Sequence, residues 1–335
     1  MTTQTKTSLV LSGLDGSNPL AFLAALGTAR VLSMVYSVES IRLGWQLAAG
    51  TWRPVISFAD LTSVGDDRVN GDSKFDEFEL EPATLCETMA DWLSSPPQLS
   101  LLESQDLGDN LTISPEAFRT LASEQLDRAC EGDASSNIAL AFLAAFGTDA
   151  VHQPHSKDRS LMQDTALRTM SGAGHQHFIK FMREIIANTT STHLYSSLFQ
   201  RWTYEDDGRG MNLRWDPIDD RRYALRWKNP SSDPPTTMRG ANRLAIEALP
   251  LFPTAPIGNS LQTTGFRSAN GTFFCWPIWD SELTLPVVQF LLQRTQSETG
   301  DNASAERRAF GICAKYRSQR ITIGKFRNFT PGTSV

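Results

Sequence analysis

Apolar positions recur along the chain in two patterns, one typical of helices and one typical of strands. The longest apolar run, residues 20–33, follows Asn18 and Pro19, which suit the cap and the first turn of a helix. Because this run leaves little polar surface, we expect a buried core helix. Further helices are predicted over residues 81–93, 114–130, 138–149, 175–190, 194–202, 239–249 and 285–294.

Strand-like runs are shorter and are separated by turn residues. Residues 41–47 and 52–58 predict a hairpin, in which Pro54 favours an edge position for the second strand. Other strands are predicted over residues 213–215, 223–227, 272–279, 310–316 and 320–326. Together these patterns predict an α+β fold of mixed helices and short antiparallel strands, with Ala-rich buried helices in its core.

The length of the chain, 335 residues, is compatible with two domains or one large one. The best candidate for a boundary is the polar stretch at residues 152–164, which contains Pro154. We therefore divide the chain into an acidic N-terminal part, residues 1–150, and a C-terminal part, residues 155–335, which ends in a basic tail. We expect the two parts to pack closely together.

The composition is that of a globular protein, with 40% apolar and 20% charged residues. No uninterrupted apolar run is long enough to cross a membrane, and the N-terminus lacks the apolar core of a signal peptide. The four cysteines are scattered without metal-binding spacing, which favours reduced thiols. We therefore expect a cytoplasmic protein that does not associate with membranes.

Charge is distributed unevenly. The formal net charge of −6 excludes a uniformly basic nucleic-acid coat but allows a local basic patch. Residues 1–110 carry 15 acids and 6 bases, whereas residues 301–335 carry 7 bases and 2 acids. An acidic front and a basic tail indicate different neighbours at the two ends. The alternative is a solvated surface whose charges balance in three dimensions.

Residues 213–223 bring arginines, acids and aromatic side chains close together in sequence. Such arginines can contact a nucleic-acid backbone while the aromatic rings stack on bases. The alternative, which we favour, is a structural turn in which the arginines pair with the adjacent acids. A less favoured interpretation is a metal-dependent nuclease whose ligands are Asp216, Asp219 or Asp220. The nucleic-acid candidates in this segment are Arg214, Arg221 and Arg222.

The predicted helix at residues 239–249 begins with Arg239, Asn242 and Arg243. Basic side chains at a helix N-terminus oppose the helix dipole, and a bound anion would relieve that cost. These three residues are therefore candidate phosphate ligands. Pairing with the chain's own carboxylates is an equally open alternative.

The C-terminal tail interleaves basic residues with Phe310, Tyr316 and Phe326. Because alternate residues of a strand share a face, a hairpin here would form a basic ridge. Such a ridge suits nucleic acid or an acidic protein surface. The candidates in the tail are Lys315, Arg317, Arg320, Lys325 and Arg327.

Catalytic and metal-binding patterns are weak. The histidine pairs His152/His155 and His175/His177 have no cysteine or acidic partner at a recognised ligand spacing. No Ser–His–Asp, Cys–His, nucleotide-binding or helicase signature occurs. We therefore expect a non-catalytic protein without a metal or cofactor.

The pattern LDGSNPLAFLAALGTARVL, residues 14–32, resembles one found in proteins of type I-G (formerly I-U) CRISPR–Cas systems. Shorter similar stretches occur at residues 169–172, 213–217, 220–225, 239–247, 263–266 and 328–331. They are spread over most of the chain.

The resemblance implies a subunit of prokaryotic antiviral defence. Family members are described either as large-subunit-like components, which contact target DNA, or as partners of the helicase–nuclease, which mainly bind protein. We predict a non-catalytic subunit that contacts crRNA or target DNA and neighbouring effector subunits. The alternative is a protein-only adaptor that links the effector to its helicase–nuclease.

Overall fold

The central element of the protein is helix α1 (Pro19–Val35), as seen in a computed structural model. The model describes residues 7–59, 81–153, 160–170, 176–219, 235–294, 308–323 and 326–335. The Asn18 side chain caps α1 by accepting hydrogen bonds from the backbone N–H groups of Leu20 (2.8 Å) and Ala21 (3.2 Å). Residues 19–33 are all buried, so the predicted cap and core helix are confirmed.

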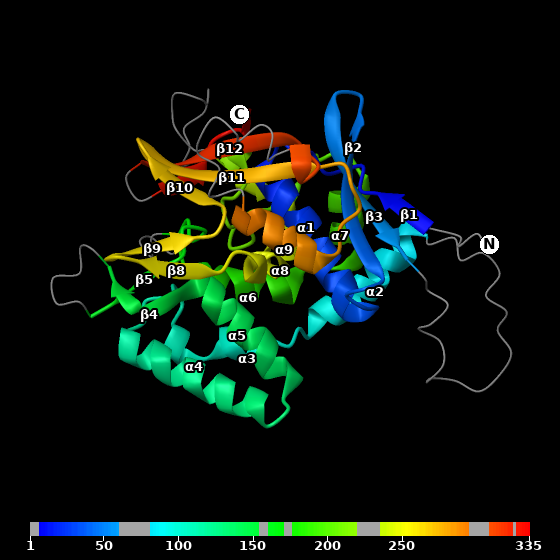
Figure 1. Ribbon diagram of the computed structural model, residues 1–335. Coiled ribbons are helices and arrows are strands. Elements are labelled where there is room, and N and C mark those ends of the chain that lie inside the picture. The colour runs from blue at the N-terminus through cyan, green and yellow to red at the C-terminus, as the bar shows by residue number, and fades with distance from the viewer. Residues whose placement is uncertain are drawn as a thin grey trace, which may run out of the picture.

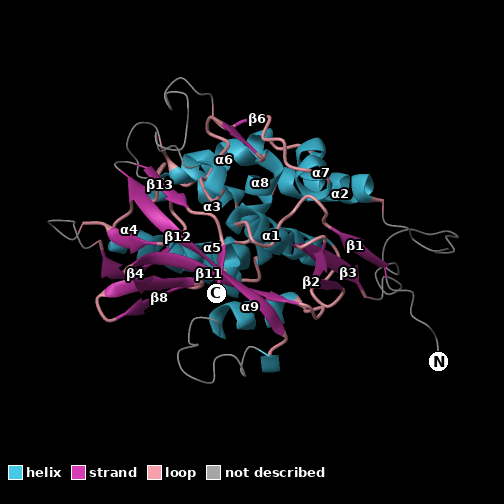
Figure 2. Cartoon of the chain, turned by 90° about the horizontal axis from the view of Figure 1, so that it is seen from above, coloured by secondary structure: helices cyan, strands magenta, loops and turns pink. Residues whose placement is uncertain are grey.

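Several helices pack on α1 and the others lie to one side of it, and the strands form small antiparallel sheets, which confirms the α+β prediction (Figures 1 and 2). The helices are α2 (Pro82–Ser94), α3 (Leu99–Glu103), α4 (Pro115–Cys130), α5 (Ala134–Phe146), α6 (Phe178–Asn188), α7 (Ser191–Phe199), α8 (Arg239–Glu247) and α9 (Leu285–Arg294). The strands are β1 (Thr7–Val10), β2 (Ile41–Ala48), β3 (Thr51–Phe58), β4 (Gly147–His152), β5 (Met162–Asp164), β6 (Asp206–Asp207), β7 (Thr236–Thr237), β8 (Thr254–Ile257), β9 (Ser260–Thr263), β10 (Phe266–Ala269), β11 (Gly271–Trp279), β12 (Ile312–Ile323), β13 (Phe326–Phe329) and β14 (Thr333–Ser334).

The first sheet has the order β1-β3-β2, and its β2–β3 hairpin confirms the prediction for residues 41–58. The expected edge position of the second strand is wrong, because β3 lies between β1 and β2. Pro54 is tolerated in this central strand because the β1 ladder ends next to it. The last β1 pair is Val10 with Val55, and the Pro54 carbonyl then accepts a hydrogen bond from Leu11 N at 2.9 Å.

The second sheet has the order β10-β11-β12-β13, with β14 also paired to β12. The sequence predicts two strands over residues 310–326, whereas β12 continues unbroken through Ser318 and Gln319. It can do so because β11 pairs with it from Trp279 to Thr272. No strand forms at residues 213–215, and residues 223–227 lie outside the described ranges. Figure 1 shows this sheet on one side of the helical centre and α4 and α5 on the other.

One hydrophobic core joins the two parts of the chain. Phe22 on α1 stacks on Trp45 of β2 (5.7 Å between ring centroids) and also contacts Trp276 of β11 (5.8 Å). Helix α1 also packs directly on α8, so the first and last thirds of the sequence share the same interior. Within the described ranges, no helix combines the length and the apolar character needed to cross a lipid bilayer.

The α1–α8 contact requires a residue without a side chain at Gly27. A Cβ atom placed there would lie 1.8 Å from the carbonyl oxygen of Leu244 on α8. Replacing glycine by alanine inside a helix usually stabilises a protein by about 0.5–1 kcal/mol. Here the two backbones would have to separate, so the expected sign is reversed.

We predict that Gly27→Ala lowers the free energy of unfolding by about 2 kcal/mol or more, as overpacked cores do. Urea-induced unfolding followed by circular dichroism measures this. Ser123→Ala, on the exposed side of α4, is the control and should change stability by less than about 0.5 kcal/mol. A Gly27→Ala protein as stable as the wild type would contradict the close contact.

Candidate nucleic-acid interface

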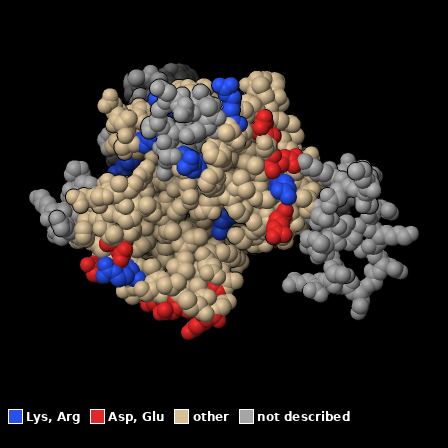
Figure 3. Space-filling model, in the orientation of Figure 1, with Lys and Arg blue, Asp and Glu red and all other residues tan. Residues whose placement is uncertain are grey.

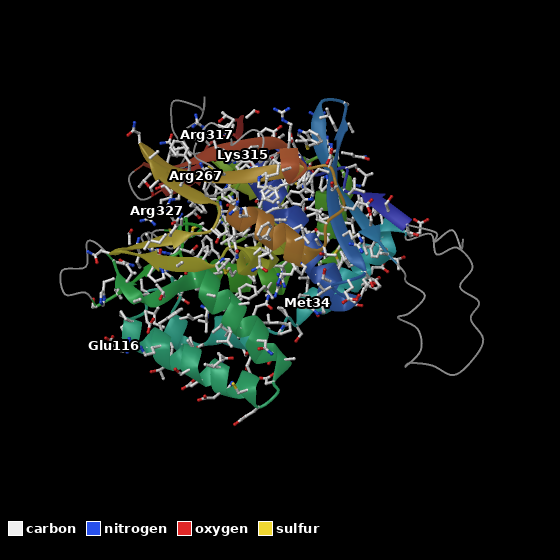
Figure 4. All side chains as sticks on the ribbon, viewed as in Figure 1. Met34, Glu116, Arg267, Lys315, Arg317 and Arg327 are labelled. Atoms are coloured by element: carbon white, nitrogen blue, oxygen red, sulfur yellow. The ribbon has the colours of Figure 1, made fainter. Side chains whose placement is uncertain are left out.

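The face of the second sheet that points away from the core carries a group of basic side chains. Lys315 and Arg317 occupy alternate positions of β12, opposite Pro277 and Cys275 of β11, and Arg267 of β10 lies opposite Phe273. The other face of β11 is buried through Phe274, Trp276 and Ile278. We call Arg267, Lys315 and Arg317, together with Phe273, the outer basic face (Figure 4).

The three cations of the outer basic face converge on one thiol. Burial raises the pKa of Cys275, and the positive charges of Arg267, Lys315 and Arg317 oppose that increase. The Arg317 guanidinium carbon lies 5.4 Å from the centroid of the Phe273 ring, within the range of a cation–π contact. Arg317 is exposed, Arg267 is half-buried and Lys315 is only 7% exposed. The exposed positive charge of this face therefore comes mainly from the two arginines.

The expected ridge of Lys315, Arg317 and Arg320 does not form. Because β12 is one continuous strand, Arg320 points to the opposite face from Lys315 and Arg317. There its Nη1 donates to the carbonyl oxygen of Ala166 at 2.7 Å. Arg327 of β13 pairs with Thr322 and contributes to the same inner side. Burial lowers the pKa of Arg320 to about 10, and the charges of Arg327 and Arg168 add to this effect.

The structure also corrects the interpretation of Asn242 and Arg243 as phosphate ligands, because both side chains are completely buried. Asn242 accepts a hydrogen bond from Leu213 N (3.0 Å) and donates to Thr237 Oγ1 (3.0 Å). Arg243 donates to Glu247 Oε1 at 2.7 Å, so the alternative of pairing with the chain's own carboxylates holds for it.

Arg239 differs from its two neighbours because it is half-buried. Its backbone N–H donates to Asp206 Oδ2 (2.8 Å), and its Nη1 donates to the carbonyl oxygen of Asn188 (3.2 Å). The same Nη1 lies 3.3 Å from Nε2 of His193, whose pKa is lowered by burial and further by this guanidinium. Arg239 therefore connects α8 to the end of α6.

Glu247 lies between two arginines in the interior. Arg30 of α1 donates to Glu247 Oε2 (2.7 Å), while Arg243 and Gln98 donate to Oε1 (2.7 and 2.5 Å). The side chains of Arg30 and Glu247 are 3% and 0% exposed. The Arg30 guanidinium carbon is also 5.5 Å from the centroid of Phe142. This cluster joins α1 and α8 and contributes no surface for a ligand.

We predict that Glu247→Gln lowers the free energy of unfolding by about 3–5 kcal/mol, because it leaves two buried guanidinium groups without a counter-charge. Guanidinium chloride titration measures this. Asp149→Asn is the matched control, since Asp149 pairs with the exposed Arg119 (2.6 Å) and should contribute at most about 1 kcal/mol. Equal effects of the two variants would contradict a structural role for the cluster.

The Asp216 carboxylate is 2% exposed and serves as an internal acceptor. Asn18 Nδ2 (3.2 Å) and Ile218 N (3.1 Å) donate to its Oδ1, and the Tyr204 hydroxyl (3.1 Å) donates to its Oδ2. Three protein donors therefore occupy the group considered as a metal ligand. Within the described ranges, no three His, Cys, Asp or Glu side chains are arranged to hold a metal ion.

Burial raises the pKa of Asp216 despite these three hydrogen bonds. The folded protein therefore binds this proton more tightly than the unfolded chain does. The stabilisation from Asp216 is present at low pH and is lost as the pH rises from the unfolded value, near 3.8, through the folded pKa.

We predict that Asp216→Asn gains stability relative to the wild type as the pH is raised from 3.8 to neutrality. Unfolding midpoints of both proteins at several pH values measure this difference. Asp91→Asn, on the exposed side of α2, reports the general effect of removing an acid. A stability difference that moves the other way with pH would contradict the raised pKa.

Arg214 is half-buried and has a left-handed backbone (φ 57°), and its N–H donates to Asn212 Oδ1 (2.5 Å). The other candidates, Arg221, Arg222 and Lys325, lie outside the described residues, as do residues 60–80, which carry much of the acidic front.

Sequence reasoning missed Arg267 and Arg168. The Asn270-Gly271 turn is a hairpin signal that sets Arg267 opposite Phe273, so Arg267 could have been found. Arg168 comes from a distant irregular segment and has no such local signal.

Exposed acids are distributed over several elements, and α4 carries some of them. The exposed acidic residues of this helix and its C-terminal end are Glu116, Glu124, Asp127 and Glu131. In Figure 3, red side chains mark the lower edge of the molecule, the side on which α4 lies in Figure 1. Acidic side chains also lie on the right of this view, so the described surface carries acids on several sides and is not divided into one basic and one acidic face.

Comparisons with known proteins give no match: no protein-family model fits the chain, and neither the curated proteins nor the solved structures contain a similar one.

Proposed function

We propose that this chain is a non-catalytic, nucleic-acid-binding subunit of a type I CRISPR effector complex in the cytoplasm. The observation that carries the proposal is the outer basic face, where cations from β10 and β12 surround an aromatic side chain. Arginines contact phosphates regardless of sequence, and aromatic rings offer a stacking surface for bases. The ligand would be crRNA or single-stranded target DNA. The effector system itself is inferred from the family resemblance of residues 14–32 and the shorter segments.

The local grouping of basic side chains supports a subunit that meets a polyanion through one face. The outer basic face is suited to a polyanion, whereas exposed acids lie on several other elements, α4 among them. The net charge of −6 argues against binding that depends on the molecule as a whole. Binding should therefore depend on the local cluster and fall steeply with salt.

We predict that the double variant Arg267→Glu/Arg317→Glu binds a labelled single-stranded oligonucleotide at least about tenfold more weakly at low salt. The slope of log affinity against log salt should decrease by about one or more, because two phosphate contacts are lost. Filter binding over a salt series measures both quantities. The matched control is Arg128→Glu, at the exposed end of α4 and close to the acids of that helix, which should bind like the wild type.

The same measurement separates this proposal from a protein-only adaptor. An adaptor should show no oligonucleotide binding that depends on Arg267 and Arg317, yet should co-purify with effector or helicase–nuclease subunits after nuclease treatment. Unchanged binding curves for the double variant would remove the basis of the nucleic-acid proposal.

A further inference from the structure

A polar pocket of about 550 Å³ lies on the inner side of β12, opposite the outer basic face. The β8–β9 hairpin and the segment after β5 form two of its walls, and β10, β12 and β13 form the others. In Figure 4, Arg327 lies between β10 and this hairpin. Because the pocket lies apart from the outer basic face, a ligand bound there would be additional to the proposed function and would not depend on it.

Three arginines and one acid line the pocket: Arg168, Arg320, Arg327 and Asp164. Arg168 holds Asp164 through both Nη2 (2.5 Å) and Nε (2.7 Å), and its Nη1 donates to the carbonyl oxygen of Met170 (2.7 Å). Asp164 is therefore already engaged by one of the three cations. The four side chains together carry a charge of +2 when the acid is ionised.

The other two arginines keep donors available for a ligand. Arg320 uses Nη1 for the carbonyl oxygen of Ala166, and no described residue accepts a hydrogen bond from the Arg327 guanidinium. Burial and the charge of Arg168 both lower the pKa of Arg327, with Asp164 opposing them, so the cluster carries repulsion that a bound anion would relieve.

We propose that this pocket binds a phosphomonoester group, held by Arg320 and Arg327. A phosphomonoester carries a charge of about −1.5 to −2 near neutral pH, which matches the pocket charge, and its oxygens fit the planar donor fork of arginine. A phosphodiester within a strand carries only one negative charge. Gln262, Ser268 and Thr272 offer further polar groups on the walls.

The size of the pocket indicates that more than the phosphate enters. Pockets for small organic ligands have volumes of about 300–1,000 Å³, and this one falls within that range. Ile257 and Leu261 give it an apolar wall against which a sugar or base can lie. The phosphomonoester can therefore belong to a mononucleotide or to the 5′ end of a nucleic-acid strand.

Isothermal titration with adenosine 5′-monophosphate, with adenosine as the phosphate-free comparison, tests the pocket. We expect saturable binding of the monophosphate only, weakened at least tenfold by Arg327→Gln. The matched control is Arg317→Gln, which removes the same charge from the opposite face of the same sheet and should leave this binding unchanged. Ser268→Glu, at an exposed position on the rim, should also abolish binding by repulsion without disturbing the core.

A second measurement distinguishes the two sources of the phosphate. If the ligand is a strand end, a 5′-phosphorylated oligonucleotide binds more tightly than its 5′-hydroxyl counterpart, and Arg327→Gln removes the difference. If the ligand is a free nucleotide, the two oligonucleotides bind equally while the monophosphate still binds.

The proposal is overturned if neither the monophosphate nor the phosphorylated end shows binding that depends on Arg327. It is also overturned if Arg317→Gln weakens monophosphate binding as much as Arg327→Gln does. The Arg267→Glu/Arg317→Glu protein should still bind the monophosphate. Loss of oligonucleotide binding at the outer basic face can therefore be told apart from loss of monophosphate binding in the pocket.

Discussion

The contact between α1 and α8 is the constraint on which the rest of the structure depends. At Gly27 the two helices meet backbone to backbone, without an intervening side chain. Near this contact, Glu247 accepts a hydrogen bond from Arg30, which lies 217 residues earlier in the chain. A buried carboxylate held by two guanidinium groups is costly to break and restricts how the helices can slide or rotate. The two sheets are attached to this pair through Phe22, which touches Trp45 and Trp276.

Four segments that are far apart in the sequence, residues 14–32, 169–170, 213–217 and 239–247, meet in this same interior. Asn18 caps α1 and also donates to Asp216, while the Thr169 hydroxyl donates to the carbonyl oxygen of Leu213 (2.5 Å). The N–H of Leu213 in turn donates to Asn242 (3.0 Å). These segments therefore mostly build the core. The basic side chains of β10, β12 and β13, among them Arg267, Arg317 and Arg327, lie outside those segments.

Much of the fold could be predicted because its signals are local. The Asn18-Pro19 cap, the Ser114-Pro115 start of α4 and the β2–β3 hairpin each depend on a few neighbouring residues. The distribution of the basic residues of the tail between the two faces of the sheet could not be predicted. Whether Ser318-Gln319 forms a turn or continues a strand depends on pairing with β11, which comes from elsewhere in the chain. That pairing decides which face each arginine takes. Likewise, Arg243 has the local appearance of a helix-start anion ligand. Its partner Glu247 is only four residues away, but the burial of this pair depends on packing against α1 and on Arg30, which is distant in the sequence.

Placing basic residues on both faces of one strand would give an acidic protein two physically different ways to hold an anion, as we propose. On the outer face, the exposed Arg317 would act through solvent, where salt screens charge over about 8–10 Å, which would favour many weak contacts along a nucleic-acid strand. On the inner face, the guanidinium groups are half-buried, and screening there is weaker because less water and salt can enter. Recognition there depends on the charge and shape of one group rather than on charge density. Arg317 and Arg320 lie three residues apart on β12. Because successive residues of a strand point to opposite faces, this odd spacing alone places the two arginines on different faces of the sheet.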